Sequence, residues 1–217
     1  MPRTSSAETA PARVARLWPL VSAATGFLLV GALAAVIVFR GANKPFGFEL
    51  EWMHEVAEDR GPFWTALALT FNFLGGGIFA FVVVPLSIII ALVITRRPWA
   101  ALYFGIASLA SAGLVDLLKH LVSRTRPDTI LVRVDLGSFP SGHSANAALL
   151  AATLGIILRR TWVWAAGIVY TVGMMLSRTY LGAHWISDTI GGVLVGAGVA
   201  VIVWAPFANK LFREKHG

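Results

Sequence analysis

The sequence predicts an all-α membrane protein, a single bundle of six transmembrane helices. Hydrophobic residues make up 57% of the 217 residues and charged residues only 13%, whereas a soluble domain carries about 25% charged residues. The mean hydropathy is +0.73. Long uncharged stretches lie between the charges, and most have the length of about 17–25 residues that one membrane crossing needs. This composition excludes both a soluble enzyme and a disordered chain.

The net charge of +7 does not indicate nucleic-acid binding. The basic residues stand at the ends of the apolar stretches and do not follow one face of an element. Cysteine is absent, which excludes disulfides, a thiolate nucleophile and a cysteine metal site.

Six uncharged stretches define the expected crossings: 17–39, 61–95, 98–115, 136–158, 161–177 and 189–209. The second, with 35 residues, is too long for one helix and too short for two helices with a turn. Asn72 and the run Gly75-Gly76-Gly77 interrupt it. We therefore expect the crossing to cover Phe73 to Thr95, with residues 63–71 at the membrane interface.

A short acidic segment precedes this stretch. Apolar side chains between residues 48 and 56 are interspersed with four acids, Glu49, Glu51, Glu55 and Glu58. This pattern predicts an amphipathic helix on the membrane surface.

The positive-inside rule predicts the orientation. With six crossings, one side holds both tails and the turns at residues 96–97 and 159–160, with ten basic residues and two acids. The other side holds eight basic residues and nine acids. We expect a cytoplasmic tail over 1–16, the membrane domain over 17–209 and a cytoplasmic tail over 210–217.

A cleaved signal peptide is the alternative for the first crossing, because Ala32-Leu33-Ala34 resembles a cleavage site. However, 23 uncharged residues exceed the apolar region of about 7–15 residues in signal peptides. The small-residue motif also lies in the middle of the stretch.

Three segments carry charges where a membrane protein rarely has them. Taken singly, a Lys or Arg at a helix end is explained by snorkelling to the headgroups. Snorkelling does not explain all of these charges together, because an even number of crossings brings all three segments to the same outer face. They are Lys119 to Pro127, Ser138 to Ser144, and Ser177 to Asp188.

Each segment contributes a different chemical feature. Lys119 and Arg126 are seven residues apart, so on a helix that Pro127 stops they share one face and form an anion site. Pro140, Ser141 and Gly142 suit a helix start, whose free N–H groups favour a phosphate, with His143 in the first turn. His184 and Asp188 are four residues apart, so on a helix the carboxylate accepts a hydrogen bond from the imidazole. A purely structural histidine–aspartate pair is the alternative.

Metal ligation is not indicated, since His54, His120 and His216 lack partners at ligand spacing. We expect His120 at the membrane interface and the other two in solvent.

The three segments resemble the motifs of the type 2 phosphatidic acid phosphatase (PAP2) family. In this sequence the motifs read Lys119 to Arg126-Pro127, Pro140-Ser141-Gly142-His143, and Ser177-Arg178 to His184 and Asp188, without a substitution. The resemblance extends from about the second crossing to the sixth.

The resemblance implies metal-independent hydrolysis of a phosphate ester without a cofactor. It implies that His184 attacks phosphorus and forms a phosphohistidine, that Asp188 orients its ring, and that His143 acts as acid and then base. It also implies phosphate binding by the remaining motif residues, Lys119, Arg126, Ser141, Gly142 and Arg178. Arg124 lies inside the first motif without matching it, and we interpret it as a headgroup contact.

The expected substrate is a lipid phosphate that reaches the outer face from the bilayer. The family suggests undecaprenyl diphosphate, phosphatidic acid, phosphatidylglycerol phosphate and diacylglycerol pyrophosphate, and we place undecaprenyl diphosphate first. A lipid phosphotransferase and a non-catalytic lipid-binding or transport protein are the alternatives. Vanadium haloperoxidases share the motifs but are soluble. The glycines at 191, 192, 196 and 198 permit close helix packing, within the bundle rather than between subunits.

Overall fold

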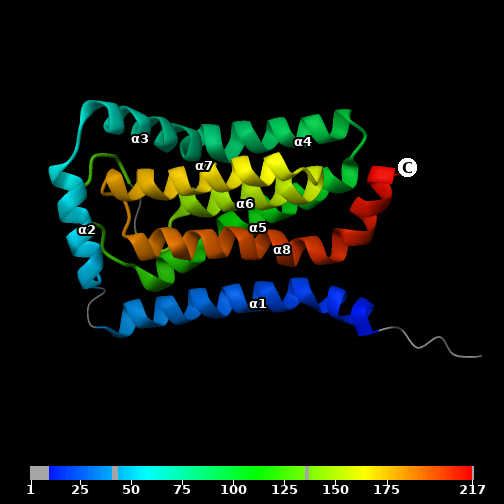
Figure 1. Cartoon of the computed structure of the whole chain (residues 1–217), viewed down its shortest axis with the longest axis horizontal. Coiled ribbons are helices and arrows are strands. Elements are labelled where there is room, and N and C mark those ends of the chain that lie inside the picture. The colour runs from blue at the N-terminus through cyan, green and yellow to red at the C-terminus, as the bar shows by residue number, and fades with distance from the viewer. Residues whose placement is uncertain (1–9, 41–43, 135–136, 217) are drawn as a thin grey trace, which may run out of the picture.

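The computed structural model describes residues 10–40, 44–134 and 137–216. Within these ranges every regular element is helical, and the long helices run side by side with α2 across one end (Figure 1). The elements are α1 (Ala10–Phe39), α2 (Gly47–Glu58), α3 (Pro62–Gly75), the π-helical turn η1 (Phe79–Val83), α4 (Val84–Ile94), α5 (Pro98–Val122), α6 (Gly142–Leu158), α7 (Thr161–Tyr180) and α8 (Ile186–His216).

Local sequence signals explain several helix ends. Proline occupies the first turn of α3 and α5, where its missing N–H costs no hydrogen bond. Ser141 is the N-cap of α6, and its hydroxyl accepts a hydrogen bond from the Ser144 N–H. Ser123 and Arg159 adopt left-handed backbone conformations that end α5 and α6.

The core lies where α5, α6 and α8 pack against one another, with side chains from α1 and α4, and α7 packs on α6 outside this cluster. Close approach of α6 and α8 depends on two glycines. A Cβ at Gly196 would lie 2.0 Å from the Ala145 carbonyl oxygen, and one at Gly192 would lie 2.4 Å from the Ser141 carbonyl oxygen. Gly191 and Gly198 face Phe139 and Phe27, so all four α8 glycines pack within the bundle. Helix α1 packs mainly on α8.

Helices suited to a membrane confirm the class of the protein but not the number of crossings. Three described helical segments are long and apolar enough to span a bilayer: Leu17–Phe39, Pro98–Val122 and Ile186–Glu214. The pair formed by α3 with Phe79–Ile94 gives a fourth if it is one bent span, and α6 is apolar but only 17 residues long. The count of six therefore stays a prediction.

The expected boundary at Phe73 is wrong. Helix α3 continues to Gly75, and the chain resumes at η1 after a break, with a bend of 43° between the two parts. The glycine run allows this break, since Gly77 has a φ of +60°. Residues 63–71 consequently belong to the same bent helical segment and pack against α7.

The two ends of the bundle differ in what they carry. Figure 1 shows the start of α1, the end of α8 and the turn between α4 and α5 at one end, with α2 at the other. The chain segments that join α5 to α6 and α7 to α8 lie at the α2 end.

Candidate active site

The three charged segments of the sequence meet at the α2 end of the bundle, around one cavity of about 980 Å³. The cavity lining combines motif residues from all three segments: Lys119, Arg126, Gly142, His143, Arg178 and His184. This confirms that the segments share one face. Of the expected site residues, Ser141 and Asp188 do not line the cavity.

Lys119 and Arg126 come together by a route that differs from the expected one. Helix α5 ends at Val122, so Arg126 does not lie on it and Pro127 is not what stops it. The two side chains instead converge on the Gly137 carbonyl oxygen, to which Lys119 Nζ donates at 2.9 Å and Arg126 Nη2 at 2.8 Å. Backbone geometry after the helix, which the seven-residue spacing does not encode, produces the convergence.

His143 lies in the first turn of α6, as expected. Its Nε2 is buried and has no hydrogen-bond partner among the described residues. The break after α3 passes directly beside the ring, because a Cβ at Gly76 would lie 2.4 Å from Nε2. Ser141 is fully buried, and its hydroxyl accepts a hydrogen bond from the Ser144 hydroxyl at 3.1 Å as well as capping α6.

His184 precedes α8 and is not part of it, which changes its relation to Asp188. Its Nδ1 is 2.8 Å from the Ser138 carbonyl oxygen and 3.7 Å from Asp188 Oδ2. The carbonyl can only accept, so Nδ1 carries the proton and Nε2 keeps its lone pair. The expected imidazole–carboxylate hydrogen bond is therefore replaced by one to a backbone carbonyl.

The electrostatics around His184 favour the neutral ring. Burial lowers the pKa of His184 well below its usual value, and three neighbouring cations lower it further. Its Nε2 accepts a hydrogen bond from Arg126 Nη1 at 3.3 Å, because a guanidinium can only donate. An uncharged imidazole beside fixed cations retains a lone pair for nucleophilic attack.

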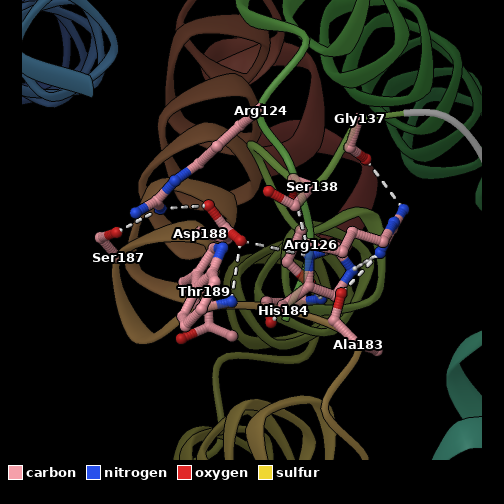
Figure 2. A network of polar contacts seen from close by, with 12 residues as sticks. Arg124, Arg126, Gly137, Ser138, Ala183, His184, Ser187, Asp188 and Thr189 are labelled. Atoms are coloured by element: carbon pink, nitrogen blue, oxygen red, sulfur yellow. Dashed lines mark hydrogen bonds and ion pairs between the residues drawn. The ribbon is translucent and has the colours of Figure 1, made fainter. Parts of the chain in front are cut away.

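Asp188 is fully buried and is held by other groups (Figure 2). Its Oδ1 accepts a hydrogen bond from Arg124 Nη1 at 2.7 Å, and its Oδ2 accepts one from the Trp185 N–H at 2.8 Å. Arg124 also donates to the Ser187 hydroxyl at 2.7 Å. Asp188 thus fixes the start of α8, directly after His184.

The interpretation of Arg124 as a headgroup contact is wrong. Arg124 is 1% exposed and forms ion pairs with Asp188 and with Glu49 of α2. Glu49 is also fully buried, although the sequence placed it on a membrane-surface helix. The helix itself is confirmed as α2, and its other acids, including Glu51 and Glu55, are exposed.

Arg178 lies in the last turn of α7 and donates a hydrogen bond to the Asn72 side chain. Asn72 lines the same cavity, so α3 contributes to the site. In the sequence, Asn72 was interpreted only as an interruption of an apolar stretch. A lone amide in such a stretch was the available signal, because a polar group at membrane depth needs a partner.

His54 and His120 stay outside the cavity lining. His54 and His120 are exposed, next to Glu58 and Asp116 respectively. The His216 side chain lies outside the described part of the structure. Among the described residues, no group of three or more His, Asp or Glu side chains is arranged to hold a metal ion.

The cavity is amphipathic. Its walls away from the cations are built from apolar side chains of η1, α4, α5 and α6, such as Val82, Leu86, Ile89, Leu109 and Leu149. A charged group on an apolar chain matches this division.

The fold and the site define a class of protein: a helical membrane protein with a cationic, two-histidine cavity at one end of its bundle. The chain belongs to the PAP2 superfamily, whose family model matches residues 100–211.

Two solved structures resemble the chain. One is the transmembrane PAP2-type phosphatidylglycerolphosphate phosphatase from Bacillus subtilis, 25% identical, with a TM-score of 0.76 over 87% of this chain and 96% of that one. The other is Aquifex aeolicus LpxE, 27% identical, with a TM-score of 0.63 over 73% of this chain and 95% of that one. No curated protein sequence matches the chain significantly. The family and these likenesses support a phosphoric ester hydrolase of the membrane lipid phosphatase type.

Proposed function

We propose that the protein is a metal-independent phosphatase that removes a phosphate group from a membrane lipid through a phosphohistidine intermediate. The observation that carries the proposal is the cavity that His143 and His184 share with the three motif cations, Lys119, Arg126 and Arg178. A fourth cation, Arg133, also lines it. Fixed cations stabilise the charge that spreads over the phosphoryl oxygens in the transition state.

His184 is the proposed nucleophile. Its Nε2 lone pair forms the N–P bond while the bond from phosphorus to the lipid oxygen breaks. Its Nδ1 keeps its proton and donates a hydrogen bond to the Ser138 carbonyl oxygen, 2.8 Å away. This contact supports the tautomer that has its lone pair on Nε2. Asp188 contributes in two ways. It fixes the backbone beside His184, and it places a negative charge near the ring, with Oδ2 3.7 Å from Nδ1.

His143 is the proposed acid and base. Protonated, it gives its proton to the leaving lipid oxygen, and as the neutral ring it then takes a proton from the water that attacks the phosphohistidine. Inorganic phosphate leaves and both histidines return to their starting states. The buried Nε2 without a partner among the described residues supports a role that needs a free ring nitrogen. The Gly142 N–H, at the start of α6, is the proposed backbone donor to the phosphate, with Ser141 holding that turn.

The substrate is proposed to be a lipid because the apolar walls continue directly from the cationic end of the cavity. Phosphatidylglycerol phosphate gains support from the phosphatase of that specificity among the similar structures. Undecaprenyl diphosphate, the first candidate from the sequence, and phosphatidic acid also combine a phosphate group with an apolar chain. Six crossings, cytoplasmic termini and an outward-facing site complete the proposal. The membrane helices argue against a soluble haloperoxidase.

The test is phosphate release by the detergent-purified protein in EDTA, with these three lipids offered separately. We expect release from at least one lipid, and loss of turnover by about 10⁴-fold or more in His184→Ala, as when a nucleophile is removed. His120→Ala is the matched control, because His120 is exposed and outside the cavity lining. Near-normal turnover in His184→Ala, or activity that depends on added magnesium, would falsify the mechanism. Transfer of phosphate to another lipid without release of inorganic phosphate would indicate the phosphotransferase.

A further inference from the structure

Glu49 is the one acid of α2 that the fold buries completely. Its Oε2 accepts hydrogen bonds from Arg124 Nη2 at 2.7 Å and from the Phe46 N–H at 2.9 Å. Its Oε1 accepts from the Ser187 N–H at 3.0 Å and from the Ser187 hydroxyl at 2.5 Å. The carboxylate therefore joins α2 to the segment after α5 and to the start of α8.

These contacts lead towards the reacting groups. Arg124 bridges the two buried carboxylates, with 2.7 Å to Glu49 on one side and 2.7 Å to Asp188 on the other. Asp188 in turn binds the Trp185 N–H, in the residue that follows His184. Glu49 is thus three hydrogen bonds, through Arg124 and Asp188, from the backbone that carries the proposed nucleophile.

Helix capping alone does not explain Glu49. The hydrogen bond to the Phe46 N–H is an ordinary N-terminal capping contact, and an exposed glutamate supplies it at no desolvation cost. Burying the carboxylate against Arg124 is costly unless both charges are fully paired. The four hydrogen bonds to Glu49 pair its carboxylate, whereas Arg124 keeps one buried nitrogen, Nε, without a hydrogen-bond partner among the described residues.

We propose that Glu49 is a positioning residue, which acts through Arg124 to fix Asp188 and the start of α8 and so holds His184 in line with the bound phosphate. The proposal rests on the phosphatase function proposed above. Glu49 does not line the cavity and does not touch the substrate.

The test compares Glu49→Gln with Glu51→Gln, an exposed acid two residues along α2. Glutamine keeps the shape of Glu49 but has only one oxygen, so its N–H₂ faces either Arg124 Nη2 or the Ser187 N–H, and neither of these groups can accept. We expect kcat to fall by about tenfold or more, as when a hydrogen bond to a charged group is lost, while KM changes by less than about twofold, since the phosphate ligands stay in place. Glu51→Gln should match the wild type.

Action through Arg124 gives a second, independent expectation. In an Arg124→Gln background, Glu49→Gln should lower kcat by much less than it does alone, because the two substitutions break one network. Ser187→Ala, which removes one hydroxyl between the same groups, should lower kcat in the same way but less. If Glu49→Gln does not fold, Ser187→Ala replaces it in the test. A full effect of Glu49→Gln in the Arg124→Gln background, or a rise in KM at unchanged kcat, would overturn the proposal.

A spectroscopic measurement separates this inference from the proposed function. In protein labelled with ¹⁵N in the histidine rings, the wild type should show His184 as one neutral tautomer with a protonated Nδ1, assigned from the signal that His184→Gln loses. Glu49→Gln should shift or broaden that signal and Glu51→Gln should not. An unchanged signal would overturn the positioning role whether or not lipid phosphate is hydrolysed, whereas a wild type that releases no phosphate would count only against the phosphatase.

Discussion

Arg124 and Arg126 stand two positions apart in the chain but occupy opposite environments. Arg126 lines the cavity, whereas Arg124 is buried between two carboxylates. The guanidinium of Arg124 uses both terminal nitrogens, Nη1 for Asp188 and Nη2 for Glu49. Only a forked cation makes both contacts at once.

Arg124→Lys should consequently impair the proposed phosphatase although all of the proposed phosphate ligands are intact. The ammonium keeps the charge but satisfies only one carboxylate fully, and losing a hydrogen bond to a charged group costs about 1.5–3 kcal/mol. We expect phosphate release to fall by about tenfold or more, with a lower melting temperature by tryptophan fluorescence. Arg213→Lys, an exposed arginine near the end of α8 and outside the cavity lining, is the control. Equal activity of Arg124→Lys and the wild type would contradict the buried role.

At this scale the sequence identified three of the cavity cations and both histidines because motif spacing specifies residue types. It did not indicate Arg133, which also lines the cavity but belongs to no motif. It could not identify Glu49, since four glutamates alternate with apolar residues in that segment and nothing local distinguishes the buried one. Its partner Arg124 lies 75 residues away. The same limit explains why the sequence assigned Arg124 to the headgroups.

The break between α3 and α4 places the backbone of Gly76, which has no side chain, next to His143, the proposed acid and base. Gly76 has an extended conformation, with a φ of −134°, that any residue adopts. The constraint at this position is therefore space, because a Cβ would lie 2.4 Å from His143 Nε2.

Gly76→Ala should displace the His143 ring and lower phosphate release by about tenfold or more, as expected when a general acid–base group is moved out of line. Folding should be largely retained, because the backbone conformation is open to alanine. Gly113→Ala in α5, where a Cβ would meet nothing within 4 Å, is the matched control. Wild-type turnover of Gly76→Ala would show that His143 tolerates the shift or does not take part.

Helix positions were largely predictable from charge-free stretches, whereas helix ends near the site were not. The start of α6 followed from Ser141 and Gly142, which are local capping signals. The end of α5 depends on the left-handed Ser123, and no strong local signal marks that residue. The break after Gly75 was visible as a glycine run, but glycines do not specify the 43° angle between the two parts.

At the scale of the whole molecule, the orientation in the membrane is open to a direct test. The chain contains no cysteine, so any introduced cysteine reports one position. Leu131 is exposed in the connection between α5 and α6, and Thr161 is exposed at the turn between α6 and α7. If the site faces outward, a membrane-impermeant maleimide should label Leu131→Cys in intact cells and Thr161→Cys only after permeabilisation. The reverse pattern would place the site inside.

The Gly137 carbonyl has a consequence for ligand discrimination. It is a neutral oxygen to which Lys119 and Arg126 both donate, so the two cations lie side by side before any ligand binds. One acceptor does not use all the N–H groups of an ammonium and a guanidinium, which have three and five. An anion at the proposed site would therefore meet two cations that are already placed together, whereas an uncharged lipid would gain no comparable interaction. In the proposed function, this difference separates lipid phosphates from the neutral lipids around them.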